Sequence, residues 1–120
     1  MADATKDGDR PERQPYAYRV YVILLDAAVR ERKRFLAANP NARSDGLCAY
    51  VGHTVRTADE RFDQHKRGVK ANRYVRDFGV RLLTDPSWAT GPFASHVEAA
   101  ATEADLARRL RAEGWFVWTN

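Results

Sequence analysis

Residues 16–25 read YAYRVYVILL, and this stretch decides the fold. Aromatic and β-branched side chains dominate it, and nearly every position is apolar. A strand with one face in water alternates apolar and polar residues, whereas a strand that is apolar throughout is covered on both faces. We therefore expect residues 16–25 to form a central strand of a sheet.

A helix and a second strand are expected directly after this strand. Residues 26–40, DAAVRERKRFLAANP, carry helix formers and charges and end at a proline, which disfavours a helical residue before it. Residues 47–52, LCAYVG, follow a loop rich in Asn, Ser and Asp and predict a strand that ends at Gly52. The sequence thus predicts one surface helix followed by a second strand.

Two short helices are expected in the middle of the chain because their caps are visible. The sequence TADE places Thr57 and Glu60 as a capping box, and the helix that follows is expected to run to about Gly68. Asn72 can cap a second helix, which Gly79 is expected to end as a left-handed cap.

The last third of the chain predicts two strands around a long helix. Residues 80–84, VRLLT, have the composition of a third strand, and residues 115–118, WFVW, that of a short final strand. Between them, residues 95–113 repeat Ala, Leu and Arg at helical spacing and are followed by Gly114. The elements together predict a mixed α/β (α+β) domain.

Length and composition predict one globular domain. A chain of 120 residues with 44% apolar side chains can bury a core large enough to fold alone. Residues 1–15 are polar and charged, and we expect them to be a disordered tail before a domain at residues 16–120. Twenty Lys and Arg against sixteen Asp and Glu give a net charge of +4, which does not by itself indicate a nucleic-acid partner.

Cellular placement is expected to be cytoplasmic. Cys48 is the only cysteine, so no intramolecular disulfide forms and a reducing compartment is the simpler interpretation. The N-terminal residues lack the apolar run of a signal peptide, and no segment approaches the roughly twenty apolar residues that cross a bilayer. We expect no contact with a membrane.

Several short motifs occur in an order that resembles a known family. Arg19-Val20-Tyr21 ends in a tyrosine on the first strand, Tyr50-Val51-Gly52 lies on the second, and the helix after it carries Arg61 and, four residues later, His65. A glutamate follows within the last long helix. This arrangement resembles the GIY-YIG nuclease superfamily over roughly residues 16–120.

The resemblance implies a fold and an activity. It implies a small, largely antiparallel central sheet flanked by helices, and a metal-dependent endonuclease that cuts phosphodiester bonds in nucleic acid. Glu103 would anchor one Mg²⁺ or Mn²⁺ ion, and Arg61 would steady the scissile phosphate. Tyr21, Tyr50 or His65 would position and deprotonate the attacking water. Some family members also have an asparagine after the glutamate, where this chain has Asn120.

The chain departs from the family pattern at three places. Arg19 replaces the first glycine of the first motif, and a helix-containing insertion separates Tyr21 from Tyr50. One extra residue lies between Gly52 and Arg61. An insertion that extends over the surface has a modest loop-closure cost, because that entropy grows slowly with length.

Helical periodicity gives an independent view of the same residues. Arg61 and His65 border the apolar stripe of their helix, where Arg61 could bind a phosphate or a structural carboxylate or carbonyl, and His65 could be a base or a buried hydrogen-bonded side chain. Glu103 falls on the inward arc of its helix, whereas Glu98 falls on the outward arc. A carboxylate on an inward arc needs a partner, either a cation such as Mg²⁺ or Arg61.

A basic run follows the proposed catalytic helix and predicts phosphate contacts. No acidic residue interrupts it before Asp77, although a solvated face has the same composition. The cations of this run are Lys66, Arg67, Lys70, Arg73 and Arg76.

The expected partner is nucleic acid, with DNA favoured and RNA left open. One alternative is a catalytically inactive nucleic-acid-binding module of the same fold, because the first motif is imperfect. Another alternative is a protein-interaction domain that uses the inserted helix at residues 27–37.

Overall fold

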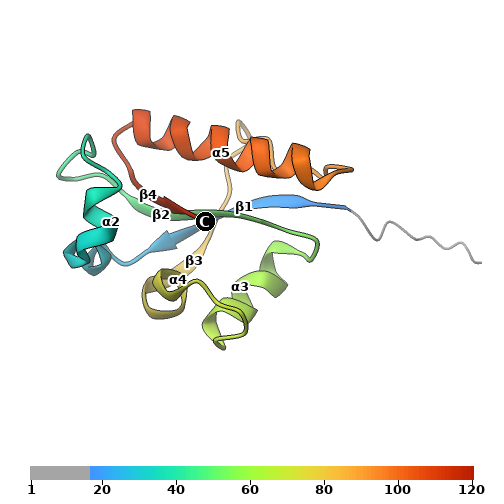
Figure 1. Ribbon diagram of the computed structural model, residues 1–120, viewed down its shortest axis with the longest axis horizontal. Coiled ribbons are helices and arrows are strands. Elements are labelled where there is room, and N and C mark those ends of the chain that lie inside the picture. The colour runs from blue at the N-terminus through green and yellow to red at the C-terminus, as the bar shows by residue number, and fades with distance from the viewer. Residues whose placement is uncertain (1–16) are drawn as a thin grey trace, which may run out of the picture.

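The computed structural model describes residues 17–120, and the tail expected at residues 1–15 lies outside the described residues. The described chain folds into an α+β domain built on one four-stranded mixed sheet with helices on both faces (Figure 1). No described helix is long and apolar enough to span a membrane.

The sheet has the strand order β3-β1-β2-β4. β1 (Arg19–Leu25) pairs antiparallel with β2 (Cys48–Thr54) on one side and with β3 (Gly79–Leu83) on the other. β4 (Phe116–Thr119) pairs parallel with β2, so the sheet is mixed rather than antiparallel throughout. The central position of the first strand, expected from its apolar run, is confirmed.

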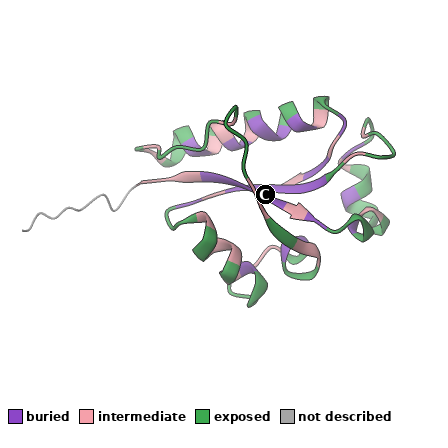
Figure 2. Cartoon of the chain, turned by 180° about the vertical axis from the view of Figure 1, so that it is seen from behind, coloured by how far each residue is buried: buried purple, intermediate pink, exposed green. Residues whose placement is uncertain are grey.

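Two layers of helix cover the sheet. α5 (His96–Ala112) packs on one face, and α3 (Ala58–Lys66) and α4 (Arg73–Phe78) pack on the other (Figure 1). We call these the α5 face and the α3 face. Alternation along each strand sends neighbouring side chains to opposite faces. Val20 and Val22 therefore join the α5 core, whereas Tyr21 and Ile23 join the α3 core. Burial is concentrated in the strands and on the sheet side of α5 (Figure 2).

The inserted segment forms two short helices, so the expectation of one surface helix was wrong. A 3₁₀ helix, η2 (Ala27–Glu31), is followed by α2 (Lys33–Ala37), and Arg32 between them is extended at φ −81° and ψ 122°. Val29 and Phe35 are both fully buried. Six residues apart in one continuous helix, they would point ~120° away from each other. The break lets both side chains enter the core.

Caps begin α3 and α4 as expected, but the end of α4 differs. Thr57 and Glu60 form a full capping box, and Asn72 accepts hydrogen bonds from the first N–H groups of α4. Gly79 has φ −65°, not the left-handed value, and passes directly into β3. Glycine is needed here for space instead, since a Cβ would lie 2.5 Å from the carbonyl oxygen of Val75.

The long helix has the limits expected from the sequence. Ser95 caps α5, and Gly114 follows it in the left-handed conformation, at φ +96°. Glu103, Leu106 and Leu110 are buried on its sheet-facing side, as the helical periodicity predicts.

Candidate active site

Tyr21, Tyr50 and His65 meet on the α3 face of the sheet. Their rings form a cluster whose centroids are 5.5 to 6.2 Å apart. All three side chains are buried, with exposed fractions of 4, 3 and 0% respectively. The hydroxyl of Tyr21 lies 2.9 Å from Nε2 of His65, although the two residues are 44 positions apart. The structure therefore brings together three residues that were singled out on separate motifs.

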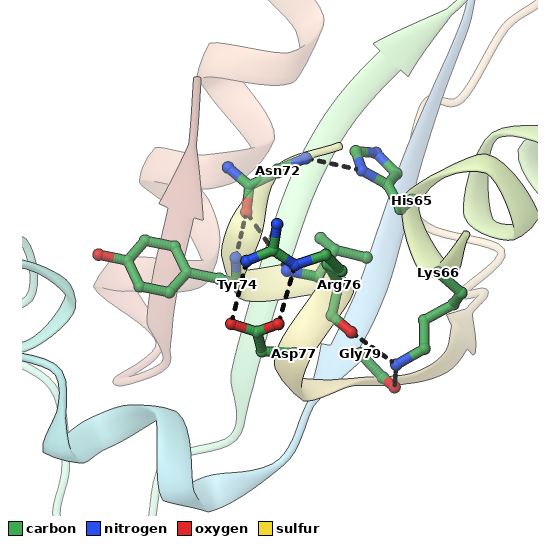
Figure 3. Close-up of polar contacts among 8 residues, drawn as sticks. His65, Lys66, Asn72, Tyr74, Arg76, Asp77 and Gly79 are labelled. Atoms are coloured by element: carbon green, nitrogen blue, oxygen red, sulfur yellow. Dashed lines mark hydrogen bonds and ion pairs between the residues drawn. The ribbon is translucent and has the colours of Figure 1, made fainter. Parts of the chain in front are cut away.

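His65 has both ring nitrogens engaged. The backbone N–H of Asn72 donates to Nδ1 at 3.0 Å (Figure 3), so Nδ1 is an acceptor and the ring hydrogen of the neutral form lies on Nε2. Nε2–H then donates to the hydroxyl oxygen of Tyr21. Burial lowers the pKa of His65 to about 4, with Arg61 adding to the effect. The ring is neutral at physiological pH and has no lone pair left for a proton from water.

The two tyrosine hydroxyls are protonated near neutral pH. Burial raises the pKa of Tyr21, and the neighbouring Tyr50 raises it further, while Arg61 acts in the opposite direction. Burial also raises the pKa of Tyr50. Each hydroxyl oxygen accepts a hydrogen bond from a fixed donor: His65 for Tyr21, and Asn120 for Tyr50. The two hydroxyls also interact with each other, because each tyrosine contributes to the pKa of the other.

Gly52 makes room for this cluster. It lies directly opposite Tyr21 in the β1–β2 ladder, on the same face of the sheet. A Cβ at this position would lie 2.6 Å from the hydroxyl oxygen of Tyr21 and 2.8 Å from Cε2 of Tyr50. Any larger residue would push the Tyr21 ring away. The glycine of the second motif therefore has a local steric cause.

Arg61 projects from α3 toward the loop before α4. Its guanidinium donates to Oε1 of Gln64 at 3.1 Å and to the backbone carbonyls of Val69, at 3.2 Å, and Lys70, at 2.9 Å. Lys70 has φ +45°, a conformation that is uncommon outside glycine. Of the alternatives that the sequence left open, the backbone-carbonyl contact is present. Arg61 is also close enough to Tyr21 to lower the pKa of that hydroxyl.

Asn120 connects the end of the chain to the cluster. Its Nδ2 donates to the hydroxyl of Tyr50 at 3.0 Å, and its Oδ1 accepts from Nδ2 of Asn72 at 3.1 Å. Asn72 also donates through its backbone to His65. Sequence reasoning noted Asn120 and missed this role of Asn72, because nothing local in the sequence relates a helix cap to a distant histidine.

Glu103 is buried as predicted but has other partners than Arg61. Only 8% of it is exposed, Oε1 lies 2.5 Å from Nδ1 of His53, and Oε2 accepts from the hydroxyl of Thr119. The expected alternative of a pair with Arg61 is therefore wrong. Strand alternation explains the partners, because His53 follows Val51 by two residues on the α5 face and Thr119 stands in the same relation to Val117.

Glu103 and the tyrosine cluster make their contacts on opposite faces of the sheet, and the consecutive residues Thr119 and Asn120 connect them. Glu103 belongs to α5 and contacts side chains of the α5 face, whereas Tyr21, Tyr50 and His65 face α3. The two groups are still electrostatically linked, since the Glu103 carboxylate contributes to the raised pKa of Tyr50. Direct contact among all the predicted catalytic residues is not present.

A divalent cation fits Glu103 only as a partly hydrated ion. Residues 17–120 contain no group of three His, Cys, Asp or Glu side chains that could hold a metal. Each carboxylate oxygen offers two lone pairs, and the contacts with His53 and Thr119 use one on each. Mg²⁺ is commonly held by one or two carboxylates, water and substrate phosphates. The residues fit such an ion and do not form a closed metal cage.

The cations of the predicted phosphate rim fall into two sets. Lys66 donates to the carbonyls of Arg76 and Gly79 (Figure 3). Arg67 pairs with Asp63, and Arg76 pairs with Asp77.

Lys70 and Arg73, by contrast, are exposed and form no ion pair within the described part of the chain. Among residues 17–120, these two cations of the run form no ion pair and no side-chain hydrogen bond to a protein oxygen.

Comparison of this chain with protein-family models, with curated proteins and with solved structures finds no match.

Proposed function

We propose that this chain is a metal-dependent endonuclease of the GIY-YIG kind, which cuts phosphodiester bonds in nucleic acid, with DNA the favoured substrate. The observation that carries the proposal is the hydrogen bond between Tyr21 and His65, beside Tyr50. These three residues come from β1, α3 and β2, and each was selected on a different motif. Their convergence on one buried cluster supports the proposal.

Arg61 and the two tyrosines supply the chemistry that the free protein can offer. The planar guanidinium suits two oxygens of a phosphate, and it lies beside the Tyr21 hydroxyl. The hydroxyl hydrogens of Tyr21 and Tyr50 would orient the attacking water. The water loses one proton as its oxygen bonds to phosphorus, the bond from phosphorus to one sugar oxygen breaks, and that sugar oxygen takes up a proton.

Glu103 would hold the cation in this proposal. A bound Mg²⁺ or Mn²⁺ supplies positive charge that offsets the negative charge developing on the phosphate oxygens. The Thr119 hydroxyl and His53 keep the carboxylate oriented from the protein side. One lone pair on each carboxylate oxygen is left for the ion and its water.

His65 has a positioning role here rather than that of a base. Its pKa of about 4 keeps the ring neutral, and both ring nitrogens are already in hydrogen bonds. Donation from Nε2 to the Tyr21 oxygen fixes the direction of the Tyr21 hydroxyl. Of the three candidates for the base that the sequence left open, the two tyrosines remain.

A nucleic-acid-binding module without turnover is the second candidate. The observation in its favour is that, in the free protein, neither tyrosine is ionised at neutral pH and His65 has no free lone pair. A base would then have to arise only after substrate or metal binds. The same fold and the same basic surface would serve binding alone.

Incubation of the pure protein with plasmid DNA and a short RNA separates these candidates. Parallel reactions contain Mg²⁺, Mn²⁺ or EDTA. The nuclease proposal predicts cleavage of at least one substrate with metal and none with EDTA. If the protein binds both substrates but cleaves neither at any metal concentration, the binding module is favoured.

A further inference from the structure

Two hollows adjoin on the surface between α2 and α4. The first has a volume of about 530 Å³ and lies between residues 32–34 and the α4 helix. The second has a volume of about 350 Å³ and continues past residues 70–74 to the end of the chain. Arg34, Arg73 and Tyr74 line both hollows. The two hollows are therefore treated as one groove. We call it the α2–α4 groove.

Positive charge dominates the α2–α4 groove. Six basic side chains and one acidic side chain line it. The acid, Asp77, is already paired with Arg76 (Figure 3). Within residues 17–120, Arg34 and Arg73 form no ion pair, and both are exposed. The basic side chains are Arg32, Lys33, Arg34, Lys70, Arg73 and Arg76. The groove therefore has an excess of unneutralised cations and suits a polyanion.

The insertion provides one wall of this groove. Arg32, Lys33 and Arg34 belong to it, in the break between η2 and α2 and the first turn of α2. Phe35 anchors that turn because its side chain is fully buried. The extended conformation of Arg32 that separates the two helices thus also turns three consecutive cations toward α4.

Trp118 lies in the second hollow as an aromatic surface. It is partly exposed and packs in a stacked arrangement on Phe35, with ring centroids 6.4 Å apart and planes at 22°. The Tyr74 ring packs against it in a T-shaped arrangement, with ring centroids 4.9 Å apart. The indole is consequently held rigid between α2 and α4 while part of it lines the groove. Rigid aromatic rings beside cations are typical of surfaces on which unpaired bases stack.

The groove leads to the candidate active site. Asn120 lines its second hollow and donates to the hydroxyl of Tyr50. A strand that follows the groove past Trp118 therefore reaches Asn120, which is one hydrogen bond away from Tyr50. The positive charge of the groove and its position next to the candidate active site both favour a nucleic-acid strand as the ligand.

We propose that the α2–α4 groove binds a single strand of nucleic acid, with its phosphates on Arg34 and Arg73 and one base stacked on Trp118. The inference deepens the proposed function and rests on it for the identity of the ligand. It gives the inserted segment the role of a second wall for the substrate. It also narrows the phosphate contacts predicted from the basic run to the cations that face α2.

Binding is tested without cleavage, in EDTA, with a labelled single strand of about 12 nucleotides. The double substitution Arg34→Ala/Arg73→Ala removes two phosphate contacts. It should weaken binding roughly 25-fold in 0.1 M salt and flatten the slope of log affinity against log salt by about 1.4. The matched control is Arg81→Ala/Arg108→Ala, which removes the same charge at exposed positions of β3 and α5 outside the groove. Equal losses in both variants, or none in the first, would overturn the proposal.

Trp118 has its own test, because bases quench tryptophan fluorescence when they stack on it. Trp88 and Trp115 contact each other and do not line the groove. Trp118→Phe keeps an aromatic ring for packing and stacking but removes the emission. The variant should bind the strand within about threefold of the parent and lose the quenching. Quenching that persists in the variant would refute base stacking at this position.

Competitors identify the ligand class. A duplex of the same length that binds as tightly as the single strand, with the same loss in Arg34→Ala/Arg73→Ala, would overturn the single-strand assignment. Poly-glutamate that displaces the strand at equal charge concentration would assign the groove to acidic protein instead. Single-strand binding without any metal-dependent cleavage would refute the nuclease proposal and leave the groove proposal supported. If the double variant Arg34→Ala/Arg73→Ala cleaves as fast as the parent, the groove proposal is refuted and the nuclease proposal remains supported.

Discussion

The hydroxyl of Tyr21 lies 2.9 Å from Nε2 of His65, and this hydrogen bond joins β1 to α3 in the buried part of the molecule. The backbone N–H of Asn72 binds the other ring nitrogen and thereby fixes the position of the ring hydrogen. A loop amide thus determines the direction in which a tyrosine hydroxyl points. The residues of the candidate site are connected through the backbone as well as through their side chains.

His65 should make the stability of the protein depend on pH. Its pKa is about 4 in the folded state and near 6.5 when unfolded, so only the unfolded chain takes up a proton as the pH falls through that window. The stabilisation is fully present above pH 6.5 and is lost toward pH 4, with a total of about 3 kcal/mol. Urea unfolding at several pH values measures it. His65→Gln should remove most of this slope, whereas His96→Gln, at an exposed position, should leave it. An unchanged slope in His65→Gln would contradict the assignment.

Tyr21→Phe and Tyr50→Phe should each lower cleavage by about 100-fold, because each removes a hydroxyl that orients the attacking water. Tyr21→Phe also leaves the Nε2–H of His65 without an acceptor, which costs about 1–3 kcal/mol of folding free energy. Cleavage rates and thermal melts on both variants check this. Tyr18→Phe is the control, because Tyr18 lies outside the cluster and is partly exposed. A nuclease that works equally well without either hydroxyl would remove the tyrosines from the mechanism.

Gly52→Ala should destabilise the protein by about 2–3 kcal/mol and displace the Tyr21 ring, because the new methyl group would lie 2.6 Å from the hydroxyl oxygen. Gly68→Ala gives the comparison. Nothing lies within 4 Å of a Cβ at Gly68, so only its φ of +82° opposes the substitution, at a cost of about 1 kcal/mol. Denaturant unfolding of both variants ranks the two costs. The reverse order would mean that the Tyr21 ring yields easily.

Arg61→Lys should keep the charge, lose about 100-fold in cleavage and loosen the loop before α4. A lysine cannot bridge a phosphate with a planar fork, nor can it hold the carbonyls of Val69 and Lys70 together. Hydrogen exchange of the loop amides reports the structural effect, and cleavage rates report the chemical effect. If the loop loosens while cleavage persists, Arg61 is structural only.

Local signals made much of the fold predictable. The apolar run around Tyr21, the capping box at Thr57 and the inward arc of Glu103 each depend on residues within one or two turns of each other. Such patterns are visible in a single sequence. The structure contains all three features in the expected elements.

Features that depend on distant segments were not predictable. The break at Arg32 exists because Val29 and Phe35 are both accommodated in a core that the rest of the chain builds. The bond from Asn72 to His65 depends on how the loop before α4 folds back. The α2–α4 groove likewise needs Arg34 and Arg73 side by side, from segments that are far apart in the sequence.

For Glu103, one property was predictable from the sequence and another was not. Helical periodicity predicted its burial, since the neighbouring apolar positions share its arc. Its partners, His53 and Thr119, follow from the registers of β2 and β4 against α5, which no single segment specifies. The carboxylate therefore has partners within the protein and is also a candidate ligand for a divalent cation.

Metal-dependent cleavage by Glu103→Gln, compared with the parent and with Glu98→Gln, tests the central claim most directly. Gln keeps the size of the side chain and its contact with Thr119 but removes the charge that attracts a hard cation. Thermal melts and single-strand binding in EDTA are measured alongside, so that loss of fold is separated from loss of chemistry. We expect Glu103→Gln to remain folded, bind the strand and lose cleavage by at least about 100-fold, while Glu98→Gln, on the exposed arc of α5, cleaves like the parent. Full metal-dependent activity in Glu103→Gln would contradict the account.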